Sequence, residues 1–122
     1  MIQNQSIDNR VKQRFLIRKS DKLISVSVDN INCFYAKNRV NFLMTAENKS
    51  YVIDETMEQL ERNLHPEDFF RINRSCIVAY QGIQEVSLHS SNRLKIKLNN
   101  SETEIFVAKE RVREFKKWIG GN

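Results

Sequence analysis

The sequence has few residues that break or cross-link a chain: three glycines, one proline and two cysteines among 122 residues. This shortage of glycine and proline, with a hydrophobic share of 40%, excludes a disordered low-complexity protein and indicates a folded one. No window approaches the ~20 apolar residues of a membrane-spanning helix. The first ten residues also lack the apolar segment of a secretory signal. We therefore expect no membrane association and a cytoplasmic location.

The residues that carry most enzyme chemistry are scarce or scattered. His65 and His89 are isolated, and neither has the paired spacing of a metal site. The three glycines form no phosphate-binding loop, and no carboxylate lies in an apolar run that would raise its pKa for acid-base work. Cys33 and Cys76 each lie in an apolar run, which favours buried free thiols over the alternative of a disulfide. We expect no enzyme, no metal site and no cofactor.

Length and charge suggest one domain with an anionic partner. A chain of 122 residues is long enough for a single core and too short for two ordinary ones. Lys and Arg number 20 against 15 Asp and Glu, which gives a net charge of +5 and a pI near 9.4. Residues 1–12 are polar and without periodicity, so we expect a flexible leader or interdomain linker there and a folded domain over 13–122.

Most of the chain alternates apolar and polar residues with the period of two that is typical of half-buried strands. Ile24, Val26 and Val28 show it most clearly, because Ser25 and Ser27 separate them. The expected strands, separated by Asn-rich polar turns, lie at 14–22 with its turn, 23–28, 31–36, 40–45, 50–53, 69–80, 86–88, 93–98 and 103–107. In the strand at 93–98, basic residues share the face opposite Leu94, Ile96 and Leu98, either as an ordinary solvated face or facing phosphates: Arg93, Lys95 and Lys97.

Two segments have the helical period instead. Met57, Leu60 and Leu64 recur at helical spacing, Thr56 and Gln59 can form a capping box, and the pattern predicts a short helix over 57–63. A second helix is predicted over 108–119. Its apolar face consists of Ala108, Val112, Phe115 and Ile119, beside a basic arc of Lys109, Arg113 and Lys116. The expected fold is mainly β, with antiparallel sheets, one short internal helix and a C-terminal helix.

The most apolar segment, 69–80, contains a polar triplet of Asn73, Arg74 and Ser75. Its β-branched and aromatic residues predict a core strand that carries a polar cluster. A buried charge without partners is costly, so the alternatives for the triplet are an exposed turn or a structural ion pair.

This segment, an aromatic residue followed by Arg-Ile-Asn-Arg-Ser and an apolar strand, closely resembles the hallmark of the LytTR DNA-binding domain family. The similarity extends over roughly 15–119, with departures such as Asn73 for the usual His and Ala108 for the usual Ser. The resemblance implies a nearly all-β domain that reads DNA through three loop regions. The first and third regions reach successive major grooves, and the second lies nearer the backbone between them.

By the same resemblance, the DNA-binding residues expected in this sequence are Arg39, Asn41, Arg74, Arg93, Lys109 and Arg111. Arginine and lysine pair with guanine, asparagine pairs with adenine, and all of them can bind phosphate, so the residue types suit this role. Arg93 is expected at phosphate rather than at a base.

The resemblance implies a bacterial transcriptional regulator or the output domain of a two-component response regulator. Its expected partners are double-stranded DNA with paired direct repeats, a receiver domain or sensor kinase, and a second copy as a dimer on DNA. Two alternatives remain open from the residues. An RNA-binding β module would use similar basic loops but also exposed stacking aromatics, and a protein-interaction domain would use a free strand edge.

Overall fold

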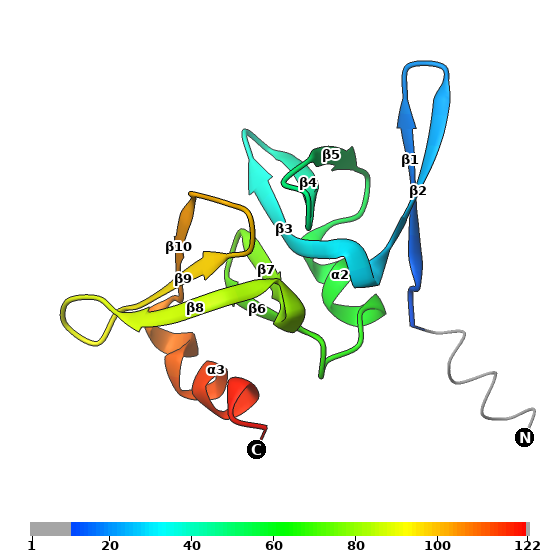
Figure 1. Cartoon of the computed structure of the whole chain (residues 1–122). Coiled ribbons are helices and arrows are strands. Elements are labelled where there is room, and N and C mark those ends of the chain that lie inside the picture. The colour runs from blue at the N-terminus through cyan, green and yellow to red at the C-terminus, as the bar shows by residue number, and fades with distance from the viewer. Residues whose placement is uncertain (1–10, 122) are drawn as a thin grey trace, which may run out of the picture.

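The computed structural model describes residues 11–121, and its strands form three antiparallel sheets (Figure 1). The central sheet has five strands in the order β5-β4-β3-β7-β6, and the others are the β1-β2 hairpin and the sheet β10-β9-β8. The strands are β1 (Arg14–Lys19), β2 (Lys22–Ser27), β3 (Ile31–Lys37), β4 (Val40–Thr45), β5 (Ser50–Ile53), β6 (Phe69–Asn73), β7 (Cys76–Ala79), β8 (Ile83–Leu88), β9 (Leu94–Leu98) and β10 (Glu104–Phe106). The helices are α2 (Met57–Asn63) and α3 (Val112–Ile119).

The centre of the five-stranded sheet is buried on both faces. Along β3 and β7, Phe34 pairs with Ile77 and packs into one hydrophobic cluster, whereas Cys33 pairs with Val78 and packs into another. Every residue of β7 is buried. Because side chains of a strand alternate between its faces, these strands supply both cores, and each needs a covering layer.

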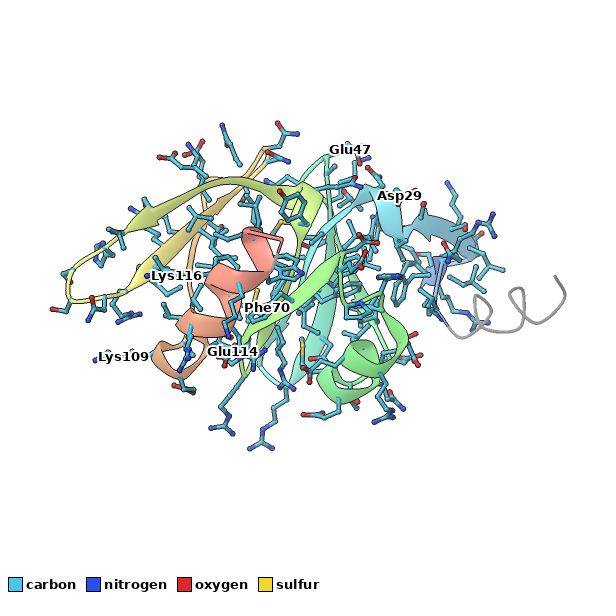
Figure 2. The ribbon with its side chains drawn as sticks, turned by 90° about the horizontal axis from the view of Figure 1, so that it is seen from below. Asp29, Glu47, Phe70, Lys109, Glu114 and Lys116 are labelled. Atoms are coloured by element: carbon cyan, nitrogen blue, oxygen red, sulfur yellow. The ribbon has the colours of Figure 1, made fainter. Side chains whose placement is uncertain are left out.

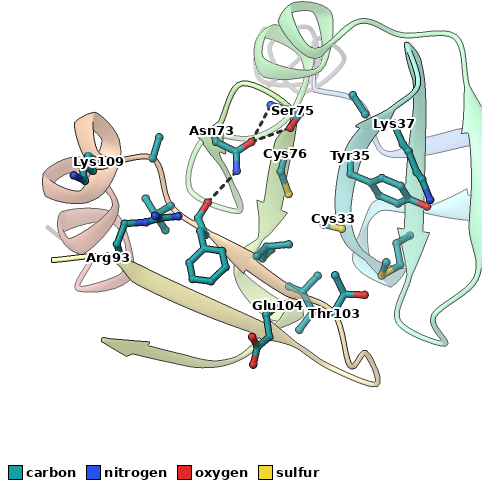
Figure 3. A pocket seen from close by; sticks show the side chains of 17 residues that line it. Cys33, Tyr35, Lys37, Asn73, Ser75, Cys76, Arg93, Thr103, Glu104 and Lys109 are labelled. Carbon is teal, nitrogen blue, oxygen red and sulfur yellow. Dashed lines mark hydrogen bonds between the residues drawn. The ribbon is translucent and has the colours of Figure 1, made fainter. Parts of the chain in front are cut away.

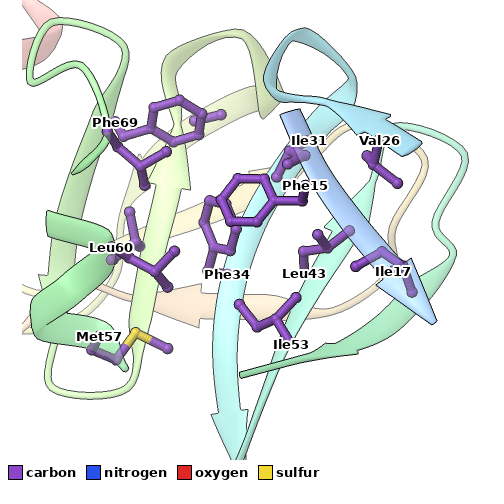
Figure 4. Packing of buried hydrophobic residues seen from close by; sticks show 13 residues of the cluster. Phe15, Ile17, Val26, Ile31, Phe34, Leu43, Ile53, Met57, Leu60 and Phe69 are labelled. Atoms are coloured by element: carbon purple, nitrogen blue, oxygen red, sulfur yellow. The ribbon is translucent and has the colours of Figure 1, made fainter. Parts of the chain in front are cut away.

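The β1-β2 hairpin and α2 cover the first face (Figure 4). Phe15 of the hairpin packs on Phe34 with ring centroids 5.2 Å apart, and Leu60 of α2 is buried in the same cluster. The predicted capping box of α2 is present, because the Thr56 hydroxyl accepts from the Gln59 N–H and the Gln59 side chain accepts from the Thr56 N–H. The expected helix over 57–63 is therefore confirmed.

The sheet β10-β9-β8 and α3 cover the second face, where Ile96, Leu98 and Phe115 are fully buried. The Trp118 indole N–H of α3 donates to the carbonyls of Pro66 and Glu67, which ties this helix to the segment before β6. In the same core, a hydrogen bond with Cys33 and burial raise the pKa of the Cys76 thiol. No helix among residues 11–121 is long and apolar enough to span a bilayer.

One strand prediction is wrong. The segment 69–80 is not a single core strand but the hairpin of β6 and β7, and Arg74 and Ser75 form its exposed turn. The pairing register shifts between Arg71 and Asn73, which places a bulge just before the turn. The apolar residues on both sides of the triplet are buried as predicted. The polar triplet itself provides turn chemistry instead of interrupting a strand.

The ends of the domain also differ from the prediction. The C-terminal helix begins with a 3₁₀ turn at Lys109–Arg111, and α-helical structure starts only at Val112. Lys12, expected in the leader, is bound to the fold because its N–H donates to the Asn63 carbonyl and its ammonium lies 3.3 Å from a Glu55 oxygen. Most of the expected leader, residues 1–10, lies outside the described part of the chain.

The central sheet is joined to β10 at the β6-β7 turn by the Asn73 side chain. Its amide nitrogen donates to the Phe106 carbonyl at 2.9 Å, and its oxygen accepts from the Ser75 N–H at 2.8 Å and from the Ser75 hydroxyl at 3.2 Å. Two residues after Phe106, the Ala108 N–H donates to the Ile72 carbonyl at 2.9 Å. The turn therefore holds the end of β10 and the segment that leads to α3.

The first prediction concerns the doubly covered sheet. Ile77→Ala should lower the free energy of unfolding by about 2 to 5 kcal/mol, because a well-packed core side chain leaves a cavity when it is truncated. Val52→Ala is the matched control, since Val52 is 56% exposed and its truncation should change stability by no more than about 0.5 kcal/mol. Urea titration of both variants measures the difference. Equal effects would contradict the burial of Ile77.

The second prediction concerns the hydrogen bonds of the Asn73 side chain. Asn73→Ala should cost about 1 to 3 kcal/mol, because it removes one donor to Phe106 and leaves the Ser75 N–H without its acceptor. Ser75→Ala loses only the hydroxyl contact with Asn73 and should cost no more than about 0.5 kcal/mol. Urea titration again supplies the measurement. A Ser75 variant as unstable as the Asn73 variant would contradict this division of roles.

Candidate nucleic-acid interface

The first candidate segment is the two-residue turn between β3 and β4. Asn38 and Arg39 both have positive φ, 54° and 66°, the backbone of the tight hairpin turns that glycine and asparagine favour. An arginine there is uncommon and costs backbone energy. Turn geometry therefore does not explain Arg39, and its exposed side chain is available to a partner.

Asn41, two residues further along, is half-buried and already has a partner in the protein. Its amide nitrogen donates to the Glu55 carbonyl at 2.7 Å, which ties β4 to the segment before α2. An adenine contact through both amide atoms would need this nitrogen. Asn41 therefore shapes the first segment from inside.

Arg71 holds the second segment, the β6-β7 turn, in place. Its guanidinium donates to the carbonyls of Asn73 and Arg74 at 3.2 and 2.6 Å, and it forms ion pairs with Glu58 at 3.3 Å and Glu61 at 3.0 Å. A hydrogen bond from the Glu58 backbone N–H lowers the pKa of the Glu58 carboxyl, and the Arg71 guanidinium lowers it further. The turn is thus fixed to α2, and the Arg74 side chain is left exposed.

Sequence reasoning did not include Arg71 among the site residues, although a structural ion pair was one of the alternatives for this stretch. The sequence signal for Arg71 was its charge inside an apolar run. Its partners could not be identified from the sequence, because Glu58 and Glu61 lie on a separate helix and reach Arg71 only in the folded protein.

The third segment runs from Lys109 to Arg111. Arg111 is half-buried: its Nε donates to the Arg71 carbonyl at 3.1 Å, and its guanidinium lies 4.6 Å from the centre of the Phe70 ring. This stacking anchors the 3₁₀ turn on β6. Lys109, two residues earlier, is exposed. Of the two residues predicted here, Lys109 faces solvent and Arg111 mainly holds the segment.

A cavity of about 830 Å³ lies where the segments meet, between β3 and β10 (Figure 3). Its walls are largely apolar and include Tyr35, Met44 and Phe106. Polar side chains from the end of β3, the β6-β7 turn, the residue before β9 and the third segment line it as well: Lys37, Asn73, Ser75, Arg93 and Lys109. Segments far apart in sequence therefore share one surface of the molecule.

The predicted residues relate to this cavity in different ways. Arg93 and Lys109 line it, whereas Arg39, Asn41, Arg74 and Arg111 do not. Arg93 is half-buried and lies over the Phe106 ring, 4.7 Å from its centre. Lys37 lines the cavity but was not predicted as a site residue. Lys37 ends β3, directly before the turn of Asn38 and Arg39, and only the folded arrangement brings it near Arg93 and Lys109.

The cations around the cavity are not neutralised. Residues 11–121 contain four ion pairs, and none includes Lys37, Arg93 or Lys109. Lys95, on the same strand face as Arg93, is instead paired with Glu104 at 3.1 Å, which agrees with the alternative of an ordinary solvated face for that residue. Within the described chain, no group of three His, Cys, Asp or Glu residues could hold a metal ion. The surface thus offers positive charge to an anion.

Comparison with known proteins identifies the family of this chain. The sequence profile of the LytTr DNA-binding domain matches residues 21–120. The transcriptional regulatory protein YpdB of Escherichia coli K12 and that of Shigella flexneri are each 26% identical over 98 residues, which is 80% of this chain and 40% of theirs. The chain therefore spans about 40% of the length of these curated relatives.

A solved structure has the same fold: the LytTr DNA-binding domain of a putative methyl-accepting/DNA response regulator from Bacillus cereus. It superposes with a TM-score of 0.81 at 20% identity and covers 89% of this chain and 98% of that chain. The predicted resemblance and the mainly β fold are both confirmed. Because the family profile covers most of the sequence, this chain belongs to the LytTr DNA-binding domain family.

Proposed function

We propose that this chain binds double-stranded DNA at specific sequences and acts as a bacterial transcriptional regulator or as the output domain of one. The observation that carries the proposal is the convergence of unpaired cations from separate segments around one cavity, with Lys37, Arg93 and Lys109 at its lining. Phosphate oxygens neutralise such cations, and arginine and lysine also read guanine in the major groove.

The proposal assigns a different part to each predicted residue. Arg39 and Lys109, which are exposed in the first and third segments, would read base edges in successive major grooves. Arg74 would bind the backbone or minor groove between them, and Arg93 would bind phosphate. Asn41 and Arg111 would mainly position these segments, because the Asn41 amide nitrogen and the Arg111 Nε donate within the protein and the Arg111 guanidinium lies over the Phe70 ring.

The wider setting is also part of the proposal. We infer that the chain works in the cytoplasm, where the DNA is, on paired direct repeats that bring two copies together. The matched regulators are longer than this chain, and the solved structure belongs to a putative response regulator, which supports a partnership with a receiver domain or sensor kinase. The proposed function implies no cofactor.

A salt titration tests DNA binding itself. If about six phosphates are neutralised, the logarithm of the association constant should fall with the logarithm of salt concentration with a slope of about −5. Fluorescence anisotropy with a labelled duplex, at several salt concentrations, measures the slope. Single-stranded RNA of the same length is the control for the RNA-binding alternative. A slope near zero on duplex DNA would rule out the proposed function.

Binding-site selection from a random library tests specificity. Arg39→Ala and Lys109→Ala should each reduce the preference for the selected site over random duplex by ~1 to 3 kcal/mol, because a lost base contact reduces discrimination. Arg93→Ala should weaken binding to both duplexes about equally and lower the salt slope by about one. If all three variants kept the wild-type preference, the assignment of base contacts to these two segments would be wrong.

A further inference from the structure

A basic groove lies next to the cavity described above, between α3 and the β8-β9 hairpin. Its volume is about 600 Å³, and its lining includes Lys109 and Lys116, which are labelled in Figure 2. Four of its nine lining residues are basic, and none is acidic: Lys109, Arg113, Lys116 and Lys117. The remaining lining residues are Leu88, Ser91, Asn92, Leu94 and Val112.

These cations have no ionic partner within residues 11–121. The four ion pairs found within residues 11–121 include none of the groove's basic residues. Lys116 and Lys117 lie in the last turn of α3, where positive charge also stabilises the helix dipole. That effect does not account for Arg113, which lies in the first turn, where the dipole disfavours a cation. The groove therefore carries positive charge beyond what helix stability requires.

Lys109, Arg113 and Lys116 form a basic strip that continues the third candidate segment. Lys109 lines both the central cavity and this groove, so the two surfaces meet at one residue. From there Arg113 and Lys116 follow on the same side of the helix, at spacings of four and three residues. Arg113 and Lys116 are about 4.5 Å apart along the helix axis, comparable with the ~3.4 Å axial rise between successive phosphates of one DNA strand.

We propose that Arg113 and Lys116 bind phosphates of the duplex that flanks the specific site, beyond the base pairs read by the three segments. The Asn92 side chain, on the opposite wall of the groove, supplies a further hydrogen-bond donor. The inference rests on the proposed DNA binding. It adds a contact that depends on the length of the DNA and not on its sequence.

The alternative occupant is an acidic segment of another protein. Such a partner would need exposed apolar surface as well as charge. Leu94 on the groove floor is already buried and Val112 is half-buried against the second core, which leaves Leu88 as the exposed apolar residue there. Charge without a wide apolar surface, continuous with a proposed DNA contact, favours phosphate.

The experiment compares two duplexes that share the site selected by the wild-type chain. One carries about one helical turn, ~10 base pairs, on each side, and the other ends at the site. The test variant is Arg113→Ala/Lys116→Ala. The control variant Lys22→Ala/Arg62→Ala removes the same charge from exposed residues of the β1-β2 hairpin and α2, which cover the opposite face of the sheet. Thermal unfolding verifies that all three proteins are folded.

On the long duplex, the test variant should bind on the order of ten-fold more weakly than the wild type, with a salt slope lower by about two. On the trimmed duplex, the two proteins should agree within about two-fold. The control variant should match the wild type on both duplexes. Trimming the flanks one at a time then identifies the side that the strip contacts.

Other outcomes overturn the inference in distinguishable ways. An equal loss on both duplexes would place the contact inside the site, and no loss on either would leave the groove for an acidic protein partner. A similar loss in the control variant would indicate a general effect of net charge. In each of these cases the wild type still binds its site, so the proposed function stands. Failure of the wild type to bind duplex DNA removes both proposals.

Discussion

Side chains of β3 and β7 alternate between two hydrophobic clusters, and each element outside the five-stranded sheet is placed by the cluster that it covers. A five-stranded sheet with one bare face would expose Cys33 and Val78, or else Phe34 and Ile77, to water. The β1-β2 hairpin with α2 and the β10-β9-β8 sheet with α3 remove that cost. The turns that join these layers are therefore fixed in space, although they contribute little to either core.

Much of this architecture could be predicted from the sequence, because the strands and α2 have clear local signals. The capping box of Thr56 and Gln59 and the alternation from Ile24 to Val28 each depend on neighbours in sequence. The β6-β7 hairpin was missed for a related reason. Buried strands on both sides of Asn73 to Ser75 have the same composition as one continuous strand, and only pairing in the folded chain separates them.

The candidate site was less predictable than the fold. All three of Arg39, Arg74 and Lys109 are exposed, but only Arg39 lies in a turn that the strand pattern predicted. Arg74 was expected in a core strand, with an exposed turn as the alternative, and Lys109 was expected in a helix. The engagement of Asn41 with Glu55, and that of Arg111 with Phe70 and Arg71, depends on residues many positions away. Sequence gives the type of side chain at a loop. Whether that side chain faces a partner or supports the loop from within is decided by tertiary packing.

The anchoring of the β6-β7 turn has a thermodynamic consequence for recognition. Asn73 holds the Phe106 carbonyl, Ala108 donates to Ile72, and Arg71 ties the same turn to α2. A loop that is already ordered loses little conformational entropy when it meets its ligand, so more of the contact energy appears as affinity. Such a domain would dock nearly as a rigid body. In the proposed DNA complex, any adjustment of shape then falls mainly on the duplex, which adds a shape-dependent contribution to the base contacts.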